Sequence, residues 1–195
     1  GHLHTNDSGL LTHHADSRLV YTVEADQEYV VRVRDVQGRG GKEYPYRMTL
    51  APLEPGFILR VRPDHPRAAQ GSSALLTVTA FRQDGFQGEI KLSAEGLPEG
   101  FTAPQAVIPE KKDEAHMIIN APADAATKMF TPKIVGTAQI GGKEVVRQAT
   151  PAEELMQAFY YMHSVPSKEF LFKVVEAGPL MLSLDLPSGE ILEIP

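Results

Sequence analysis

The 195-residue sequence contains no cysteine and no tryptophan. Without cysteine the chain has no disulfides, no thiolate metal ligands and no cysteine nucleophile, although the cellular compartment stays open. Without tryptophan it lacks the buried Trp that packs in the core of antibody domains. No apolar run approaches the roughly 20 residues that a membrane-spanning helix requires, so no membrane span is expected.

An excess of positive charge is also missing. The 19 Lys and Arg residues are outnumbered by 25 Asp and Glu residues, which gives a net charge of -6. Because phosphate binding needs clustered Lys and Arg, we expect no nucleic-acid partner. Hydrophobic residues nevertheless make up 42% of the chain, with charges of both signs interspersed. This composition predicts folded domains rather than disorder.

Motifs of common hydrolases and nucleotide-binding proteins are absent. The sequence has no G-x-S-x-G, no H-E-x-x-H, no G-x-x-x-x-G-K-[ST] and no G-x-G-x-x-G that opens a helix. The glycine-rich stretch 38–41 leads into a predicted strand, so it indicates a hairpin loop rather than a phosphate site at a helix N-terminus. We therefore predict that the chain is not an enzyme.

What the sequence does have is period-two alternation of apolar and polar residues, which is typical of half-buried strands. The pattern is clearest over 28–50, where two predicted strands flank the glycine-rich loop, and another strand is predicted at 19–23. In the second of the two strands, Tyr44 and Tyr46 share one side. Residues 51–56, with two prolines and a glycine, indicate a linker and a domain boundary.

Residues 56–150 predict one complete sandwich. Seven short strands with turn residues between them are predicted at 57–62, 73–82, 88–95, 106–108, 114–120, 132–140 and 143–149. This is the strand spacing of an immunoglobulin-like domain. Alternation places these side chains inside: Leu59, Val61, Val78, Ile90, Leu92, Ile118, Ile134 and Val146. At the opposite parity, Arg60, Lys91 and Lys133 are expected to be solvated.

Residues 151–167 carry the helical signal of the chain. The motif Thr150-Pro151-Ala152-Glu153 offers a cap residue, Pro at the first helical position and Glu three residues after the cap. It predicts a short helix near 151–160, whereas the strand-prone residues 159–161 favour an extended linker instead. Residues 168–195 return to alternation and predict strands that open a third sandwich unit.

The predicted fold is therefore all-β, with tandem β-sandwiches. One complete immunoglobulin-like domain at 56–150 is flanked by partial units at 1–52 and 168–195. An isolated three-stranded sheet with a bare apolar face is marginal. We expect the two end units to cover each other, or to pair edge strands in a homodimer. The chain starts without Met and without a signal peptide, so we expect it to be a segment of a longer protein.

Residues 5–50 contain four characteristic motifs: Asn6-Asp7-Ser8, Asp16-Ser17-Arg18-Leu19, and the stretches 28–35 and 40–47. With these motifs the stretch resembles the C-terminal half of the bacterial pre-peptidase C-terminal domain. The form it resembles is common in large secreted proteins of planctomycetes and other environmental bacteria. The resemblance implies a small β-sandwich without catalytic residues, located at the cell surface or outside the cell.

Residues 57–149 contain Gly85-Phe86, Gly88-Glu89-Ile90 and the turn 96–100, GLPEG. Through these motifs they are similar to the immunoglobulin-like repeats that follow such domains. This resemblance implies an architecture rather than an activity.

Candidate metal ligands gather near the N-terminus. His2 and His4 could reach one metal from an extended segment, and imidazole suits zinc or nickel, although adventitious binding by a polar terminus is the simpler interpretation. Asp7 and Asp16 are calcium candidates, because hard cations prefer clustered oxygens. The resemblance also implies calcium, since some pre-peptidase domains bind it. No other cofactor is predicted.

These features favour a non-catalytic structural or adhesive module of a larger secreted or surface bacterial protein. Its expected partners are other domains of that protein and an extracellular polymer or surface. Two alternatives stay open. One is a carbohydrate- or polymer-binding module, which needs an exposed aromatic row from Tyr44, Tyr46, Tyr160 and Tyr161, so burial of the first two would count against it. The other is an accessory part of a secreted peptidase.

Overall fold

The computed structural model describes residues 19–35, 37–156 and 162–178. The chain divides into two compact units, Gly1–Glu54 and Pro55–Pro195. The described residues are all-β, as the sequence predicts: they form twelve strands. They include no helix, and so none with the length and apolarity needed to cross a membrane.

In the first unit the described residues form loops and turns. The Tyr29 hydroxyl donates to the backbone oxygen of Ala25 at 3.0 Å, and its ring packs edge-on against Tyr21 at 5.6 Å. The Asp35 carboxylate accepts the backbone N–H groups of Gln37 and Arg39 at 3.0 and 2.9 Å. Such side-chain-to-backbone bonds are what favours Asp in turns.

The strands predicted at 19–23 and within 28–50 are therefore wrong for the residues described there. Their alternating apolar side chains stay in solvent: Tyr46 is 75% exposed, and Val31 and Met48 are more than half exposed. Alternation produces a stable strand where a second layer covers the apolar face, because an isolated hairpin is marginal in water. Among the described residues of this unit no such layer forms.

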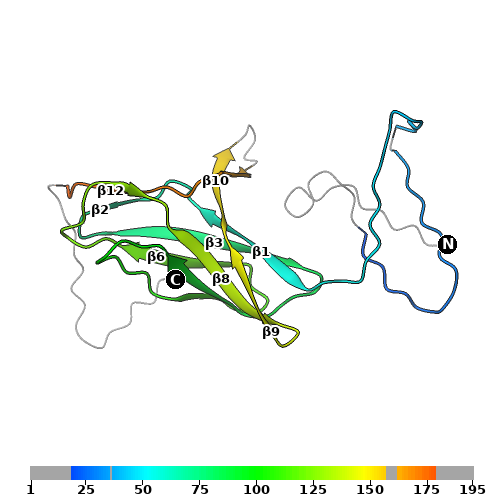
Figure 1. Ribbon diagram of the computed structural model, residues 1–195, viewed down its shortest axis with the longest axis horizontal. Coiled ribbons are helices and arrows are strands. Elements are labelled where there is room, and N and C mark those ends of the chain that lie inside the picture. Colours follow the sequence, from blue (N-terminus) through cyan, green and yellow to red (C-terminus); the bar gives the residue numbers. More distant parts are fainter. Residues whose placement is uncertain (1–18, 36, 157–161, 179–195) are drawn as a thin grey trace. The chain divides into compact units, whose positions relative to one another are not determined.

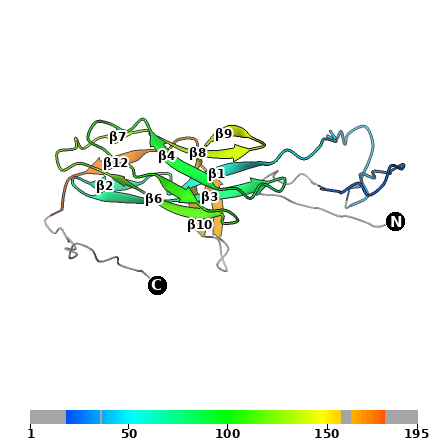
Figure 2. The same cartoon turned by 90° about the horizontal axis from the view of Figure 1, so that it is seen from below.

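The second unit is a β-sandwich of two large sheets with a small third sheet at one end (Figures 1 and 2). The first sheet has the order β11 (Met162–Pro166), β10 (Thr150–Met156), β1 (Gly56–Arg62), β3 (Ser73–Gln83), β6 (Glu114–Asn120). The second has the order β5 (Ala106–Ile108), β4 (Ile90–Glu95), β8 (Lys133–Ile140), β9 (Lys143–Gln148). The third has the order β2 (Arg67–Ala69), β12 (Phe172–Val175), β7 (Met129–Phe130).

All seven strands predicted between 57 and 149 are present with similar bounds. The predicted hairpin between β8 and β9 turns at Gly141 and Gly142, whose φ angles are 57° and 78°. Two consecutive positive φ values define the type I′ turn, whose twist matches that of the flanking strands. Local sequence therefore determined this part of the fold.

Residues after 149 extend the first sheet instead of forming a linker. Thr150 and Pro151 pair in parallel with Arg60 and Val61, and the rest of β10 pairs antiparallel with β11. The short helix predicted near 151–160 is wrong for 151–156, and residues 157–161 lie outside the described residues. Helix propensity is a weak preference, and the strand pairing together with complete burial of Ala152 overrides it.

Residues 168–178 likewise belong to this sandwich rather than to a third unit. β12 pairs in parallel with β2 and antiparallel with β7. Phe172 is fully buried, with the Phe130 ring stacked on it at 5.0 Å and the Phe101 ring edge-on at 6.2 Å. Phe172 and Val174, whose strand was expected to need cover from another unit, are thus covered within the second unit. The rest of the predicted third unit, 179–195, lies outside the described residues.

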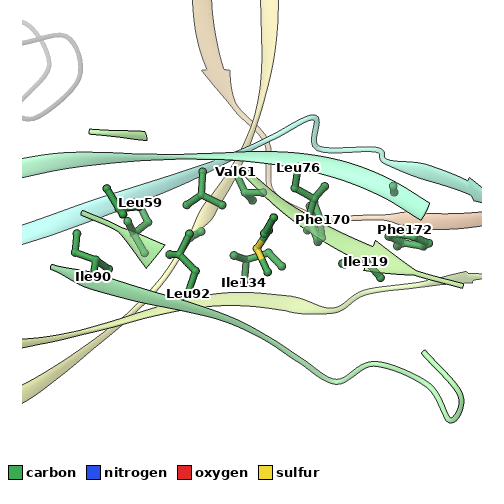
Figure 3. Close-up of a cluster of buried hydrophobic side chains, with 14 of the residues drawn as sticks. Leu59, Val61, Leu76, Ile90, Leu92, Ile119, Ile134, Phe170 and Phe172 are labelled. Carbon is green, nitrogen blue, oxygen red and sulfur yellow. The ribbon is translucent and has the colours of Figure 1, made fainter. Parts of the chain in front are cut away.

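The core lies between the two large sheets and continues to the third (Figure 3). Six of the eight predicted core residues are buried: Leu59, Val61, Val78, Ile90, Leu92 and Ile134. Ile118 and Val146 are wrong, because each is nearly half exposed. In β6, Met117 and Ile119 face the core in place of Ile118. A shift of one residue exchanges the two faces of a strand.

Gly136 lets β8 approach the opposite sheet. A Cβ atom at this position would lie 2.3 Å from Leu59 Cδ1 and 3.0 Å from Ile90 Cγ2. Contacts this short force the neighbouring core side chains to move, so the position requires glycine.

Candidate functional site

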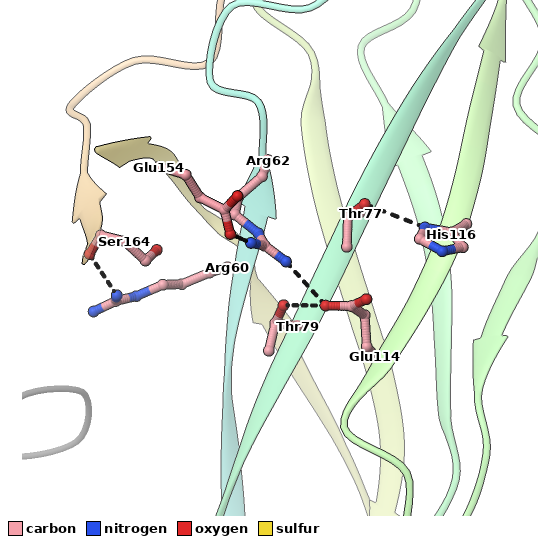
Figure 4. A network of polar contacts seen from close by, with 8 residues as sticks. All are labelled: Arg60, Arg62, Thr77, Thr79, Glu114, His116, Glu154 and Ser164. Carbon is pink, nitrogen blue, oxygen red and sulfur yellow. Dashed lines mark hydrogen bonds and ion pairs between the residues drawn. The ribbon is translucent and has the colours of Figure 1, made fainter. Parts of the chain in front are cut away.

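A polar network covers the outer face of the first sheet (Figure 4). Alternation explains its position: the core takes Val61 and Val78, so their neighbours point away from it. Arg62 on β1 contacts Glu114 on β6 at 2.9 Å and also pairs with Glu154 on β10. The Thr79 hydroxyl on β3 donates to the same Glu114 oxygen at 3.2 Å. The network therefore links four strands.

Arg60 adds a buried cation to this face, where a solvated side chain was predicted. It is 8% exposed, because the hairpin of β10 and β11 covers it. Its Nη1 donates to the Ser164 backbone oxygen at 3.0 Å, and its guanidinium lies over the Phe81 ring at 5.2 Å. Desolvation by burial lowers the pKa of Arg60. The side chain fastens β11 to β1.

Thr77 and His116 form a hydroxyl–imidazole pair, with Thr77 Oγ1 3.2 Å from His116 Nδ1. A nucleophile of this kind is activated when a third group orients the imidazole. The nearest carboxylate of the network, Glu114, instead contacts Thr79 and Arg62. Within the described residues, Thr77 and His116 therefore form a side-chain contact between the neighbouring strands β3 and β6.

A shallow depression of about 310 Å³ opens beside the network. Both polar and apolar residues line it: Arg62, Pro63, Leu75, Thr77, Glu114, Glu153 and Glu154. The Arg62 cation is already paired with two of these three carboxylates. The depression could hold a small polar group but encloses little of it.

A second cluster of polar side chains lies next to this depression. Asp64 follows β1 after Pro63 and is buried. Its Oδ2 accepts a hydrogen bond from the Ser167 hydroxyl, and its backbone oxygen accepts the N–H of Leu171 at 3.0 Å. His65 Nδ1 lies 2.7 Å from Asp64 Oδ1, and the Glu153 carboxyl of β10 approaches the same carboxylate.

The surroundings of the cluster shift the pKa values of its two carboxyl groups in opposite directions. Burial alone would raise the pKa of Asp64, but the Ser167 hydroxyl and the close polar contacts with Glu153 and His65 outweigh it and hold the pKa at about 2. The hydrogen bond to Asp64 raises the pKa of Glu153. The cluster therefore concentrates negative charge on Asp64.

The site residues predicted from the sequence, His2, His4, Asp7 and Asp16, lie outside the described residues. The sequence analysis missed the cluster of Asp64, His65 and Glu153. Asp64 has the sequence environment of a turn residue, and Glu153 that of a helix start. The parallel pairing of β10 with β1 brings them together, and no local pattern signals that pairing.

Comparison with protein-family models, curated proteins and solved structures found no match to this chain.

Proposed function

We propose that this chain is a non-catalytic structural module that spaces or targets neighbouring domains of a larger secreted or cell-surface bacterial protein. The path of the chain through the second unit supports this role. Gly56 pairs with Gln83 at the end of β3, whereas the Val175 oxygen accepts the N–H of Gln70, just before β3 begins at Ser73. The chain thus enters and leaves at opposite ends of the sandwich (Figures 1 and 2).

The separation of these ends follows from β3, which has eleven residues. At about 3.3 Å per residue, the two ends lie roughly 35 Å apart. A module of this shape lengthens a chain of domains instead of folding it back. Within the proposal the sandwich is of the immunoglobulin-like class, as its strand spacing indicates, and 5–50 belong to a pre-peptidase-like unit.

Side-chain hydrogen bonds and ion pairs that join strands and loops support the proposal of a stiff spacer. Besides the Arg62 network, Arg82 at the end of β3 donates to the backbone oxygens of Gly88, Pro109 and Lys112 at 2.6, 2.9 and 2.7 Å. One planar guanidinium therefore fixes two loops, because its donors have a rigid fork geometry.

The spacer role can be tested with two introduced cysteines, since the chain has none of its own. Spin labels on Pro55→Cys and Glu176→Cys should give a narrow distance distribution centred near ~35–40 Å by double electron–electron resonance. Stretching through the same two sites should unfold the unit in one cooperative step. A broad distribution, or yielding at the lowest measurable force, would contradict a spacer.

A polymer-binding module is the second candidate, because Tyr44 and Tyr46 are exposed rather than buried. Exposed aromatic faces stack on sugar rings and similar flat ligands. Retention of the chain on insoluble polysaccharides, lost in Tyr44→Ala and Tyr46→Ala, would favour this candidate. Val30→Ala, which removes an aliphatic side chain exposed even more than the two tyrosines, is the matched control.

An accessory role beside a secreted peptidase is the third candidate function, and it rests on the resemblance of residues 5–50 to pre-peptidase domains. In either role the chain itself should not turn over peptide, ester or glycoside substrates. The sharpest check uses the hydroxyl–imidazole pair. Turnover abolished by Thr77→Ala or His116→Ala would overturn the non-catalytic assignment.

A further inference from the structure

Asp64, His65 and Glu153 converge from two segments that are far apart in the sequence. Asp64 and His65 follow β1, and Glu153 lies on β10, which pairs with β1. Each side chain offers one ligand atom, a carboxylate oxygen or an imidazole nitrogen, and these atoms all lie within 4.8 Å of one another. Asp64 Oδ1 and His65 Nδ1 are 2.7 Å apart.

The Asp64 carboxylate supplies an independent indication of a ligand. Its side chain is 6% exposed, and the Ser167 hydroxyl occupies Oδ2. Oδ1 is buried, and its contact with His65 Nδ1 at 2.7 Å lacks the geometry of a hydrogen bond. A buried carboxylate oxygen without a well-aligned donor is costly, because it has lost water and gained little in return. It points into the space shared with His65 and Glu153, where a cation would satisfy it.

Access to this space comes from the solvent side. Asp64 is buried, whereas His65 and Glu153 are both exposed, so the cluster opens to solvent on the side of these two residues. An ion could enter while keeping water on its outer side. Its positive charge would also offset the repulsion between two carboxylates that approach each other closely.

We propose that Asp64, His65 and Glu153 bind a divalent cation of the zinc class. Imidazole with two carboxylates suits zinc and its first-row neighbours, whereas calcium and magnesium prefer ligand sets made of oxygen alone. Zinc lies about 2.0–2.2 Å from such atoms and is tetrahedral, so any two of its ligand atoms are about 3.5 Å apart. The observed separations therefore require small movements of the two exposed side chains, with water as a fourth ligand.

Bound there, the ion joins the segment after β1 to β10, the neighbouring strand of the first sheet. This role goes beyond spacing and does not depend on it. A cation that binds the folded chain and not the unfolded chain stabilises the folded state by mass action.

The test is a zinc titration of the full chain by isothermal calorimetry after chelator treatment. Because His2, His4, His13 and His14 could also bind zinc, the titration uses a background in which all four are replaced by Gln. One equivalent of Zn²⁺ should bind in that background. His65→Gln and Glu153→Gln should each weaken the affinity by at least about tenfold, a size that even outer-shell changes reach.

Matched controls sit on the neighbouring face. His116→Gln and Glu114→Gln should leave zinc affinity unchanged, because neither side chain belongs to the cluster. Both His65 and Glu153 are exposed, so their variants should fold, which far-UV circular dichroism verifies. Zn²⁺ should raise the melting temperature of the background chain and not that of His65→Gln, and Ca²⁺ at the same concentration should raise neither.

Three results would overturn the proposal. One is the absence of saturable binding of a single zinc equivalent in the four-histidine background. Another is zinc binding that survives both His65→Gln and Glu153→Gln. The third is calcium binding as tightly as zinc, which would exclude the zinc class.

Discussion

Residues 28–50 and 56–83 carry the same alternation of apolar and polar side chains, yet they end up in opposite environments. In the first stretch Val31, Val33 and Met48 are more than half exposed. In the second, Leu59 and Leu76 are completely buried. The difference lies in what surrounds each stretch. β3 has β1 on one side and β6 on the other, and a second sheet faces all three. Alternation thus specifies a strand where a partner layer is present.

The largest expected contrast between the units comes from two aromatic truncations. Phe172→Ala should lower the free energy of unfolding by about 3–5 kcal/mol, because it empties a fully buried position between two other rings. Tyr46→Ala in the first unit should change it by less than about 0.5 kcal/mol. Urea denaturation followed by far-UV circular dichroism measures both. Equal losses would show that the first unit also has a core.

Adjacent isoleucines test the register of β6. Ile119→Ala should cost about 2–5 kcal/mol, since Ile119 is fully buried. Ile118→Ala, on the solvent face, should cost no more than about 1 kcal/mol of strand preference. The same denaturation experiment applies. A larger cost at Ile118 would restore the register that the sequence predicts and refute the observed one.

Two glycines make the next comparison. Gly136→Ala should destabilise by about 1–3 kcal/mol, because the new methyl group collides with Leu59 and Ile90. Gly40→Ala should cause no loss, since no atom lies within 4 Å of the added carbon and its φ is not in the left-handed region. Thermal melting of the two variants decides the point. A tolerated Gly136→Ala would mean that the sheets can move apart freely.

The smallest effect concerns surface charge. A double-mutant cycle with Arg62→Gln and Glu154→Gln should give a coupling energy of about 0.2–1 kcal/mol, which declines as salt is added. Coupling that persists at 1 M salt would contradict a solvent-screened pair.

Asp35→Ala removes two loop hydrogen bonds in the first unit and should leave the melting of the second unit unchanged.

The sequence predicts the features that local chemistry determines. The strands between 57 and 149 follow from alternation bounded by turn residues, and Gly141-Gly142 specifies the hairpin turn almost alone. The exchange of Ile118 and Ile119 shows the limit of this reasoning. Both are equally apolar, so the pattern itself does not say which of them faces the core.

Features that depend on distant pairing could not be predicted. Pro151 and Glu153 have the local chemistry of a helix start, and β1 turns them into a strand. The same pairing brings β11 over Arg60 and buries a side chain that alternation places in water. It also carries Glu153 to Asp64, so the proposed cation site exists through tertiary structure alone.

The parallel pairing of the last strands with the first ones also has a consequence for the time course of folding. β1 pairs with β10, and β2 with β12, across roughly a hundred residues of chain, and contacts this distant in sequence slow folding. At a synthesis rate of about 5–20 residues per second, β10 and β12 leave the ribosome about 5–20 seconds after the strands they complete. During that interval one edge of β1 and one edge of β2 are unpaired. Unpaired strand edges can pair with another chain, so the nascent chain is most prone to aggregation in this period.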